Sequence, residues 1–279
     1  MASHAPILVR ALSWNLFHGR DHPPDHALGT WRSRLFGVTE RGDTHAQVNR
    51  PLLDEFAGLL GGWEWNLALL QEAPPRWLVP LCRRCRASGA SALTSRNTLA
   101  FLRAALADYN PDLIASNEGG SNMVLVRAPG RIVEVERVTV ATRPERRRML
   151  LARVEPGAGR RLAVGCVHLS VPGTGQGHAE ALRAAETATE FAGGDPLILG
   201  GDFNLRPARE ADAFVELRER FGLVEPTAPR AIDHVLARGL DVAEEPRALP
   251  PHAREVHESH GLSVRLSDHA PVAAAFGMR

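Results

Sequence analysis

Residue types that bind metal ions and phosphate stand at the ends of short apolar runs in this chain. The runs and the polar residues that follow them are Ile7–Trp14 with Asn15, Leu67–Leu70 with Gln71 and Glu72, Leu162–Val167 with His168, and Pro196–Leu199 with Gly200 to Asn204. Ser267, Asp268 and His269 precede one more run, Pro271–Phe276. In open α/β sheets, functional groups gather at strand ends and in the loops that follow. The pattern therefore predicts one site assembled from several strand ends.

Asp202 and Asn204 form the most informative pair. In an extended chain they point to the same side, because side chains alternate with a period of two. Gly200 and Gly201 allow a close backbone approach just before them. A carboxylate beside a carboxamide can deprotonate a water molecule and donate a hydrogen bond to a phosphoryl oxygen. An Asx turn that closes the strand accounts for the same two residues.

Glu72 and Asp268 are the candidate metal ligands. Glu72 follows four apolar residues, so we expect it to be partly buried. An unpaired buried carboxylate is unfavourable, and a hard divalent cation relieves this penalty. Oxygen ligands with open positions favour Mg²⁺ or Mn²⁺ over zinc. A solvated loop carboxylate is the alternative for Glu72, since Pro74 and Pro75 follow closely.

His269 and Asp233 are expected to form a carboxylate–histidine pair. An aspartate raises the pKa of a histidine and fixes its tautomer, which makes the ring a cation or proton donor for phosphate. His168 is a second candidate of this kind, and Asn15 could orient Glu72 or contact phosphate. A structural role is the usual explanation for any one histidine taken alone.

The elements that position these residues alternate along the chain. The apolar runs, which also include Met123–Val126 and Ile232–Leu236, are short and rich in branched residues, so they predict buried strands. Helical patterns occur at Ala46–Leu60, Thr98–Ala107, His178–Phe191 and Ala208–Phe221, and this alternation predicts an α/β protein. Arg131–Val140 and Met149–Val154 are expected to pair antiparallel, which makes the sheet mixed. Residues 21–44 and 244–266 form long connections. The second carries His252, His257 and His260, either as solvated residues or as a loop that faces substrate.

Composition narrows the classes of protein. The 279 residues carry a formal net charge of +1 and include no lysine, which excludes a Walker phosphate loop. Arginine, backbone N–H groups, histidine or metal must therefore hold any phosphate. Cys82 and Cys85 have the spacing of a zinc or redox pair. The third cysteine, Cys166, is alone, so there is no second cysteine pair to complete a zinc site. We expect no signal peptide and no membrane span, and hence a cytoplasmic protein.

Six short segments resemble the endonuclease/exonuclease/phosphatase superfamily with its deoxyribonuclease-like fold. They are Ser13–Asn15, Leu70–Glu72, Val167–Leu169, Gly201–Asn204, Ile232–His234 and Ser267–His269, in the order that the superfamily has them. Together they extend over nearly the whole chain. The resemblance implies a single domain, residues 1–279, built as a four-layer α/β sandwich of two packed mixed β-sheets flanked by helices.

The resemblance also implies a role for each matching residue. Glu72 resembles the principal ligand of Mg²⁺ or Mn²⁺, with Asp268 and Asn15 beside it. Asp202 resembles the residue that activates the attacking water, and Asn204 the one that holds the phosphate. His269, supported by Asp233, resembles the group that stabilises the pentavalent transition state.

Three further positions are carried over, the last two more loosely. His168 matches the branch of the superfamily that has histidine here. Asn122 and Arg148 fall where the family often has substrate-contacting residues. Arg148 also closes a basic cluster that begins at Arg143, and a solvated loop accounts for this cluster as well.

One departure limits the analogy. Phe17 stands where abasic-site endonucleases have an acidic residue, so a repair-enzyme assignment is not favoured. The segment His18 to His22 nearby is either a turn or a substrate contact.

The resemblance implies a phosphodiesterase, with nucleic acid among its substrates, as the first interpretation. A phosphatase or phospholipase-type enzyme for small-molecule or lipid phosphates is the alternative. The aromatic content of 5% argues against single-strand binding. A non-catalytic phosphate-binding relative is disfavoured, because every expected catalytic position carries a competent residue.

Overall fold

Two mixed β-sheets form the centre of the computed structural model, which describes residues 7–94, 100–114, 119–142, 146–157, 159–171, 176–258 and 260–278. The first sheet has the strand order β12 (Asp241–Ala248), β15 (Val272–Met278), β1 (Ile7–Asn15), β4 (Leu67–Ala73), β6 (Ser121–Arg127) and β5 (Ala87–Leu93). The second has the order β11 (Asp233–Arg238), β10 (Leu197–Asp202), β9 (Arg160–His168), β8 (Arg147–Gly157) and β7 (Arg131–Ala141). Strands β1 and β4 are parallel, as are β9 and β10, and the other neighbours are antiparallel.

The sheets pack face to face because their strands carry apolar side chains on both sides. On β4, Leu67 and Leu69 belong to the core between the sheets, whereas Ala68 and Leu70 belong to the core on the outer face. This alternation follows from the period of two along a strand. Burial on both faces explains why these strands are nearly continuous apolar runs in the sequence.

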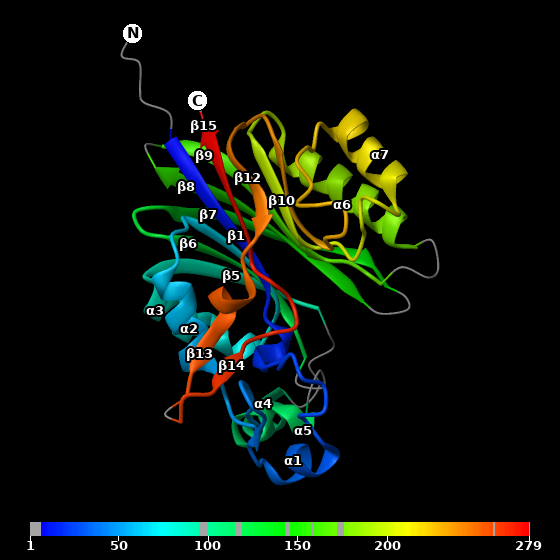
Figure 1. Cartoon of the computed structure of the whole chain (residues 1–279). Coiled ribbons are helices and arrows are strands. Elements are labelled where there is room, and N and C mark those ends of the chain that lie inside the picture. Colours follow the sequence, from blue (N-terminus) through cyan, green and yellow to red (C-terminus); the bar gives the residue numbers. More distant parts are fainter. Residues whose placement is uncertain are drawn as a thin grey trace.

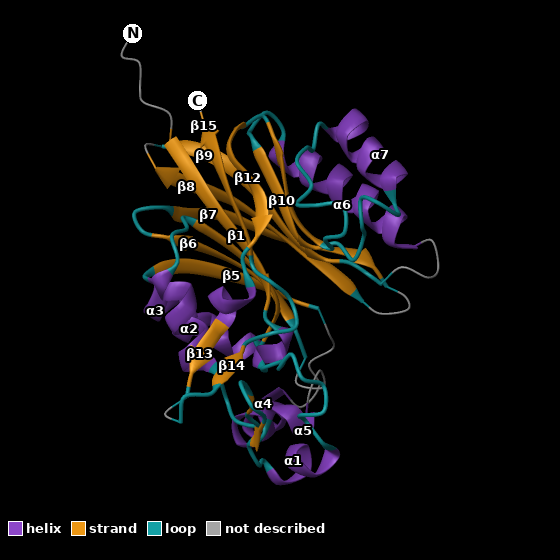
Figure 2. Ribbon diagram, viewed as in Figure 1, coloured by secondary structure: helices purple, strands orange, loops and turns teal. Residues whose placement is uncertain are grey.

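Helices cover both outer faces (Figures 1 and 2). The first sheet is covered by α2 (Leu53–Gly62) and α3 (Leu78–Cys85), and the second by α6 (Gln176–Ala192) and α7 (Ala211–Phe221). The buried stripe of α6 consists mostly of alanines 181, 184, 185, 188 and 192, spaced as one face of a helix. Small side chains there let the helix lie close to the sheet. The predicted four-layer α/β sandwich is confirmed.

Short elements occupy the two long connections. Helix α1 (Trp31–Phe36) lies near α4 (Ala100–Tyr109) and α5 (Pro111–Ile114), at the lower end of the molecule in Figure 1. The remaining elements are the strand pairs β2 (Glu40–Arg41) with β3 (Ala46–Gln47) and β13 (Glu255–His257) with β14 (Ser263–Arg265), and the 3-10 turns η1 (Phe17–Gly19), η2 (Pro75–Trp77) and η4 (Pro251–Arg254).

The structure corrects one predicted helix. Helix α2 begins at Leu53, so the prediction of helix from Ala46 is wrong for its first half. Residues 46 and 47 pair with β2, and the backbone N–H of Val48 donates to Asp21 Oδ2 over 2.9 Å. Helix α4 is described from Ala100, and the predicted start at Thr98 lies outside the described residues. Among the described helices, none is long and apolar enough to cross a membrane.

Candidate active site

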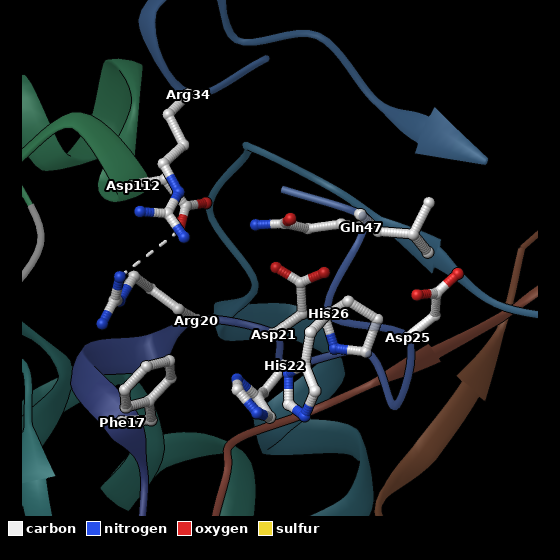
Figure 3. Close-up of a pocket in the computed structure, with 11 residues that line it drawn as sticks. Phe17, Arg20, Asp21, His22, Asp25, His26, Arg34, Gln47 and Asp112 are labelled. Carbon is white, nitrogen blue, oxygen red and sulfur yellow. Dashed lines mark hydrogen bonds and ion pairs between the residues drawn. The ribbon is translucent and has the colours of Figure 1, made fainter. Parts of the chain in front are cut away.

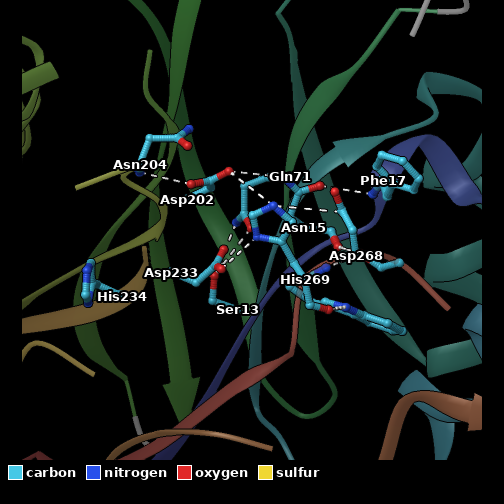
Figure 4. Close-up of polar contacts among 12 residues, drawn as sticks. Ser13, Asn15, Phe17, Gln71, Asp202, Asn204, Asp233, His234, Asp268 and His269 are labelled. Atoms are coloured by element: carbon cyan, nitrogen blue, oxygen red, sulfur yellow. Dashed lines mark hydrogen bonds and ion pairs between the residues drawn. The ribbon is translucent and has the colours of Figure 1, made fainter. Parts of the chain in front are cut away.

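The carboxyl ends of four strands meet at one edge of the sandwich. In the parallel pairs, Asn15 stands opposite Gln71, and Asp202 stands opposite His168. Asp233, the first residue of β11, stands opposite Asp202 on its other side. Figure 4 shows several of these side chains converging on one space together with His269, which comes from the loop before β15. The strand ends predicted from the sequence therefore do gather in one place.

Asp202 lies at the centre of this group and is 2% exposed. Its Oδ1 accepts a hydrogen bond from the backbone N–H of Asn204 (3.0 Å), and its Oδ2 accepts one from Asn15 Nδ2 (3.2 Å). The Nε2 atoms of His168 and His269 are 3.5 and 3.8 Å from Oδ2. Burial raises the pKa of Asp202 to about 7, and the charge of Asp233 adds to this effect, while His269 and the two hydrogen bonds oppose it. A carboxylate with this pKa can accept a proton near neutral pH.

Gly201 is required for the chain to reach this position. Its φ is +140°, and a Cβ placed there would lie 2.0 Å from the backbone oxygen of Val167. Any other residue would push β10 away from β9 and displace Asp202. Asn204 follows with φ of 54°, and its Nδ2 donates to the backbone oxygen of Leu169 over 2.9 Å.

His269 and Asp233 form the predicted pair. The His269 Nδ1 lies 2.7 Å from Asp233 Oδ2. Burial lowers the pKa of His269, but the hydrogen bond to Asp233 and the charges of Asp233, Asp202 and Asp268 outweigh this effect and raise it to about 10. His269 is therefore a cation at neutral pH.

The loop that carries His269 is fixed to strand β1. Ser267 Oγ donates to the backbone oxygen of Asn15 (2.6 Å) and accepts from the backbone N–H of His269 (3.1 Å). Trp14 Nε1 and Arg254 Nη1 each donate to the backbone oxygen of His269 over 3.0 Å. These contacts set the position of the ring before any ligand arrives.

Glu72 lies on the other side of the site, at a bulge of β4. The register of β4 and β6 shifts between Leu70 and Ala73, and Glu72 has φ of 47°. Its carboxylate lies 3.0 Å from His18 Nε2 and 3.7 Å from His168 Nε2. Burial opposes ionisation of Glu72, but the hydrogen bonds from His18 and Asn15 and the charges of His18 and His168 lower its pKa well below the usual range.

His168 contributes an uncharged ring at neutral pH. Burial lowers its pKa to about 3, and the positive charges of Arg147, His269 and His18 contribute to this shift, whereas the negative charge of Glu72 opposes it. The ring can therefore accept or donate a hydrogen bond beside Asp202 without adding charge.

His18 is a member of the site that the sequence analysis named only as part of the segment His18 to His22, either a turn or a substrate contact. Phe17 and His18 both have positive φ, 48° and 55°, a strained conformation for residues other than glycine. The Phe17 backbone N–H donates to Asn15 Oδ1 over 3.0 Å and stabilises this turn. The signal in the sequence was that this polar segment lies close to Asn15, and nothing in it indicated a contact with Glu72.

The other predicted residues lie at the edge of the site or below it. Asp268 is about one-third exposed, with Oδ1 3.9 Å from His269 Nε2. Asn122 is fully buried and donates to the backbone oxygen of Arg148 (2.8 Å). Arg148 is half-buried, and its Nε lacks a hydrogen-bond partner among the described residues. His252, His257 and His260 are exposed on and beside η4 and β13.

The donor set fits a divalent cation. The carboxylates of Glu72 and Asp202 lie within 4.0 Å of the His168 ring, and those of Asp233 and Asp268 lie within 4.0 Å of the His269 ring. Hard cations such as Mg²⁺ prefer oxygen ligands of this kind. Asp202, Asp233 and His269 offer ligand atoms within 4.8 Å of one another. However, His269 is protonated and therefore has no lone pair for a metal ion.

The predicted ligands Glu72 and Asp268 are not part of this trio, and their binding of the cation stays a prediction. The Oδ1 atom of Asn15 accepts one hydrogen bond from the Phe17 backbone N–H and keeps a second lone pair for a metal ion.

Two face-to-face mixed sheets, with carboxylates and histidines where their strand ends meet, define the class of α/β phosphoesterases. The chain belongs to the endonuclease/exonuclease/phosphatase family, whose family model matches residues 12–269. A search of curated protein sequences finds no match.

Solved structures share the fold at low sequence identity. A family protein from Bacteroides thetaiotaomicron has 17% identity and a TM-score of 0.65, covering 99% of this chain and 100% of its own. A mannosyl-6-phosphatase from the same organism has 17% identity and a TM-score of 0.63, covering 95% of this chain and 98% of its own. The human nocturnin catalytic domain with bound sulfate has 14% identity and a TM-score of 0.63, with 97% of each chain covered.

Proposed function

We propose that this protein is a divalent-metal-dependent hydrolase of phosphate esters in which Asp202 activates the attacking water. One observation carries the proposal: a carboxylate that can accept a proton near neutral pH faces a protonated histidine across a single gap. The pKa of Asp202 is raised to about 7 and that of His269 to about 10, with Asp202 Oδ2 3.8 Å from His269 Nε2. Near neutral pH, Asp202 can therefore act as a base while His269 keeps the proton that an acid donates.

The chain's own residues divide the reaction between them. Asp202 accepts a proton from the water as its oxygen attacks phosphorus, and the P–O bond to the leaving group breaks. His269, fixed by Asp233, stabilises the negative charge that develops and supplies a proton to the leaving oxygen. Asn204 keeps Asp202 in place through its backbone N–H and is proposed to contact the phosphate.

The metal site completes this arrangement. Glu72, Asp268 and Asn15 would hold Mg²⁺ or Mn²⁺, which neutralises phosphate charge when bound.

A phosphodiester is the first substrate candidate, with nucleic acid as the leading example. His168 Nε2 and His269 Nε2 lie 3.5 and 3.8 Å from one Asp202 oxygen, so a phosphate bound there would have two histidines beside it. Arg230 lines a depression of about 240 Å³ beside Asp233 and His269, and the charge of Arg147 acts on His168. Guanidinium groups at these positions suit the neighbouring phosphates of a polymer.

A phosphate ester of a small molecule is the second candidate. A polar pocket beside the site, described below, favours it, and one similar structure is a mannosyl-6-phosphatase.

The test is a hydrolysis screen with the purified protein, Mg²⁺ or Mn²⁺, and a substrate panel. The panel holds plasmid DNA, RNA, phospholipids, sugar phosphates and bis(p-nitrophenyl) phosphate. We expect hydrolysis that stops with a chelator and returns with the metal. Metal-independent hydrolysis, or none on any substrate, would contradict the proposal.

Salt dependence then separates the two substrate classes. Each duplex phosphate neutralised by the protein steepens the plot of log affinity against log salt by about 0.9. Replacing Arg146 and Arg147 by alanine should make this slope shallower on DNA. A flat slope, or one that the double variant leaves unchanged, would move the assignment to the small-molecule ester. Residues 143–145 of this basic cluster lie outside the described part of the chain.

A further inference from the structure

A second polar cavity of about 160 Å³ lies next to the candidate active site (Figure 3). Its walls come from the segment between β1 and α1, from Arg34 of α1, from Gln47 of β3 and from Asp112 of α5. The segment contributes Phe17, Arg20 and Asp21. This is the polar stretch for which the sequence left open a turn or a substrate contact.

The floor of this pocket holds buried carboxylate oxygens without partners. Asp21 is 2% exposed; its Oδ2 accepts from the Val48 backbone N–H, and its Oδ1 has no hydrogen-bond partner among the described residues. Asp112 is 6% exposed, and its Oδ1 lies 3.5 Å from Arg20 Nη1. Its Oδ2, like Asp21 Oδ1, has no hydrogen-bond partner in the described part of the chain. Figure 3 shows the Asp21 carboxylate pointing toward the side of the pocket where Gln47 and Asp112 lie. Buried polar atoms are normally hydrogen-bonded, so these two oxygens are suited to accept from a ligand.

The charges of the pocket favour an uncharged ligand. Burial raises the pKa of Asp21, and the charge of Asp112 raises it further. Burial also raises the pKa of Asp112, although the positive charges of Arg20 and Arg34 lower it. Two guanidinium groups among the carboxylates oppose the entry of a metal cation, and the carboxylates oppose an anion. Hydroxyl groups suit both partners, because they donate to carboxylates and accept from guanidinium N–H groups.

The size and the apolar wall of the pocket fit one ring. A volume of about 160 Å³ corresponds to roughly five water molecules at about 30 Å³ each. The Phe17 ring forms an apolar wall and is held by the Arg20 guanidinium 4.0 Å from its centre and by the edge of His22. A hydroxylated ring presents both an apolar face and polar edges to such a pocket.

The pocket and the phosphate site share one stretch of backbone. His18, next to Phe17, contacts Glu72, and the Ser267 backbone N–H donates to the Arg20 backbone oxygen over 3.0 Å. Asp21 forms a β-bridge with Leu266, two residues before Asp268. A ring in the pocket would thus lie beside the turn that contacts Glu72 and the loop that carries Asp268 and His269.

We propose that this pocket binds one polyhydroxylated ring of the substrate, either the pyranose of a sugar phosphate or the ribose of a nucleotide. The inference rests on the proposed phosphoesterase function and narrows its substrate class. Asp21 and Asp112 accept hydrogen bonds from ring hydroxyls, and Phe17 covers the apolar face.

The test compares three monoesters: a hexose 6-phosphate, a nucleoside 5′-monophosphate and p-nitrophenyl phosphate, whose ring has no hydroxyl groups. The variant Asp21→Asn/Asp112→Asn keeps the side-chain shapes, and Asp43→Asn, an exposed acid on the same connection, is the matched control. The ratio of kcat/KM for a hydroxylated ester to that for p-nitrophenyl phosphate should fall at least tenfold in the double variant and stay constant in the control. The ester whose ratio falls identifies the sugar. Unchanged ratios for both hydroxylated esters would overturn the proposal.

A binding measurement separates failure of this proposal from failure of the proposed function. The unphosphorylated hexose and the nucleoside are titrated into the protein, and the NMR signals of the His22 and His26 rings in the pocket wall are followed. Saturable shifts that the double variant loses would support the pocket even if no ester were hydrolysed. If neither compound shifts these signals, the ring-binding pocket is wrong, whatever the protein hydrolyses.

Discussion

Removing the carboxylate of Asp233 should take away the positive charge of His269 within the range of an ordinary pH profile. The 2.7 Å hydrogen bond to Asp233 is the largest of the effects that raise the pKa of His269 from 6.5 to about 10. At about 1.4 kcal/mol per pH unit, this net rise corresponds to about 5 kcal/mol in favour of the imidazolium. Asp202 and Asp268 supply the rest of the attraction, and burial opposes it.

In Asp233→Asn, the pKa of His269 should fall by about one to three units, the usual effect of losing an adjacent opposite charge. Activity that needs the imidazolium falls tenfold for each pH unit above that pKa. The wild-type profile should therefore rise through the pKa of Asp202 near 7 and then stay flat to about pH 9.5, whereas the variant loses activity at lower pH.

The assay is kcat/KM for bis(p-nitrophenyl) phosphate with Mg²⁺ from about pH 6 to 9.5. It runs beside an NMR titration of the His269 ring, and Asp212→Asn, an exposed acid on α7, is the control. If Asp233→Asn keeps both the wild-type profile and the wild-type pKa of His269, the pairing does not sustain the charge and the reasoning is refuted.

The remaining predictions address the base, the metal and the cysteines. Between pH 3.8 and about 7, Asp202 stays protonated in the folded protein but is ionised in the unfolded chain. The contribution of this proton to the free energy of unfolding is therefore complete below pH 3.8 and is lost as the pH rises through 7. Asp202→Asn should thus abolish most turnover. In metal-free protein at about pH 8, the same variant should have a free energy of unfolding higher by up to about 4 kcal/mol. If urea unfolding shows the variant to be less stable than the wild type, the raised pKa of Asp202 is wrong. Glu72→Gln should lower both Mg²⁺ affinity in calorimetry and the rate, and unchanged affinity would show that the ligand is another group. Cys82→Ser and Cys85→Ser should leave activity and metal content nearly unchanged, because burial raises the pKa of both thiols; loss of a stoichiometric zinc would contradict this.

Much of the sandwich could be predicted because its central strands are buried on both faces. Runs such as Leu162–Val167 are apolar at nearly every position, and the polar residue that ends each one marks the edge of the sheet. Strand β12 was not predicted, because it is an edge strand with mostly exposed residues and a proline at position 246. Strand β5 was also missed, since alanine, serine and glycine dominate it.

The site could be predicted only where it depends on strand ends. Asp202 and His168 lie opposite each other through the register of β9 and β10, which follows from two parallel buried strands. The contact of His18 with Glu72 depends on positive φ at Phe17, His18 and Glu72, none of which is glycine. Such strained turns arise from tertiary contacts, so local sequence carries little sign of them.

The most direct test of the account is hydrolysis of bis(p-nitrophenyl) phosphate by metal-free protein into which Mg²⁺ or Mn²⁺ is titrated, with Asp202→Asn measured in parallel. We predict no turnover before metal is added, saturable activation of the wild type, and metal binding without turnover in the variant. Wild-type hydrolysis in the presence of a chelator, or a wild-type rate in Asp202→Asn, would contradict the assignment of a metal-dependent phosphoesterase with Asp202 as its base.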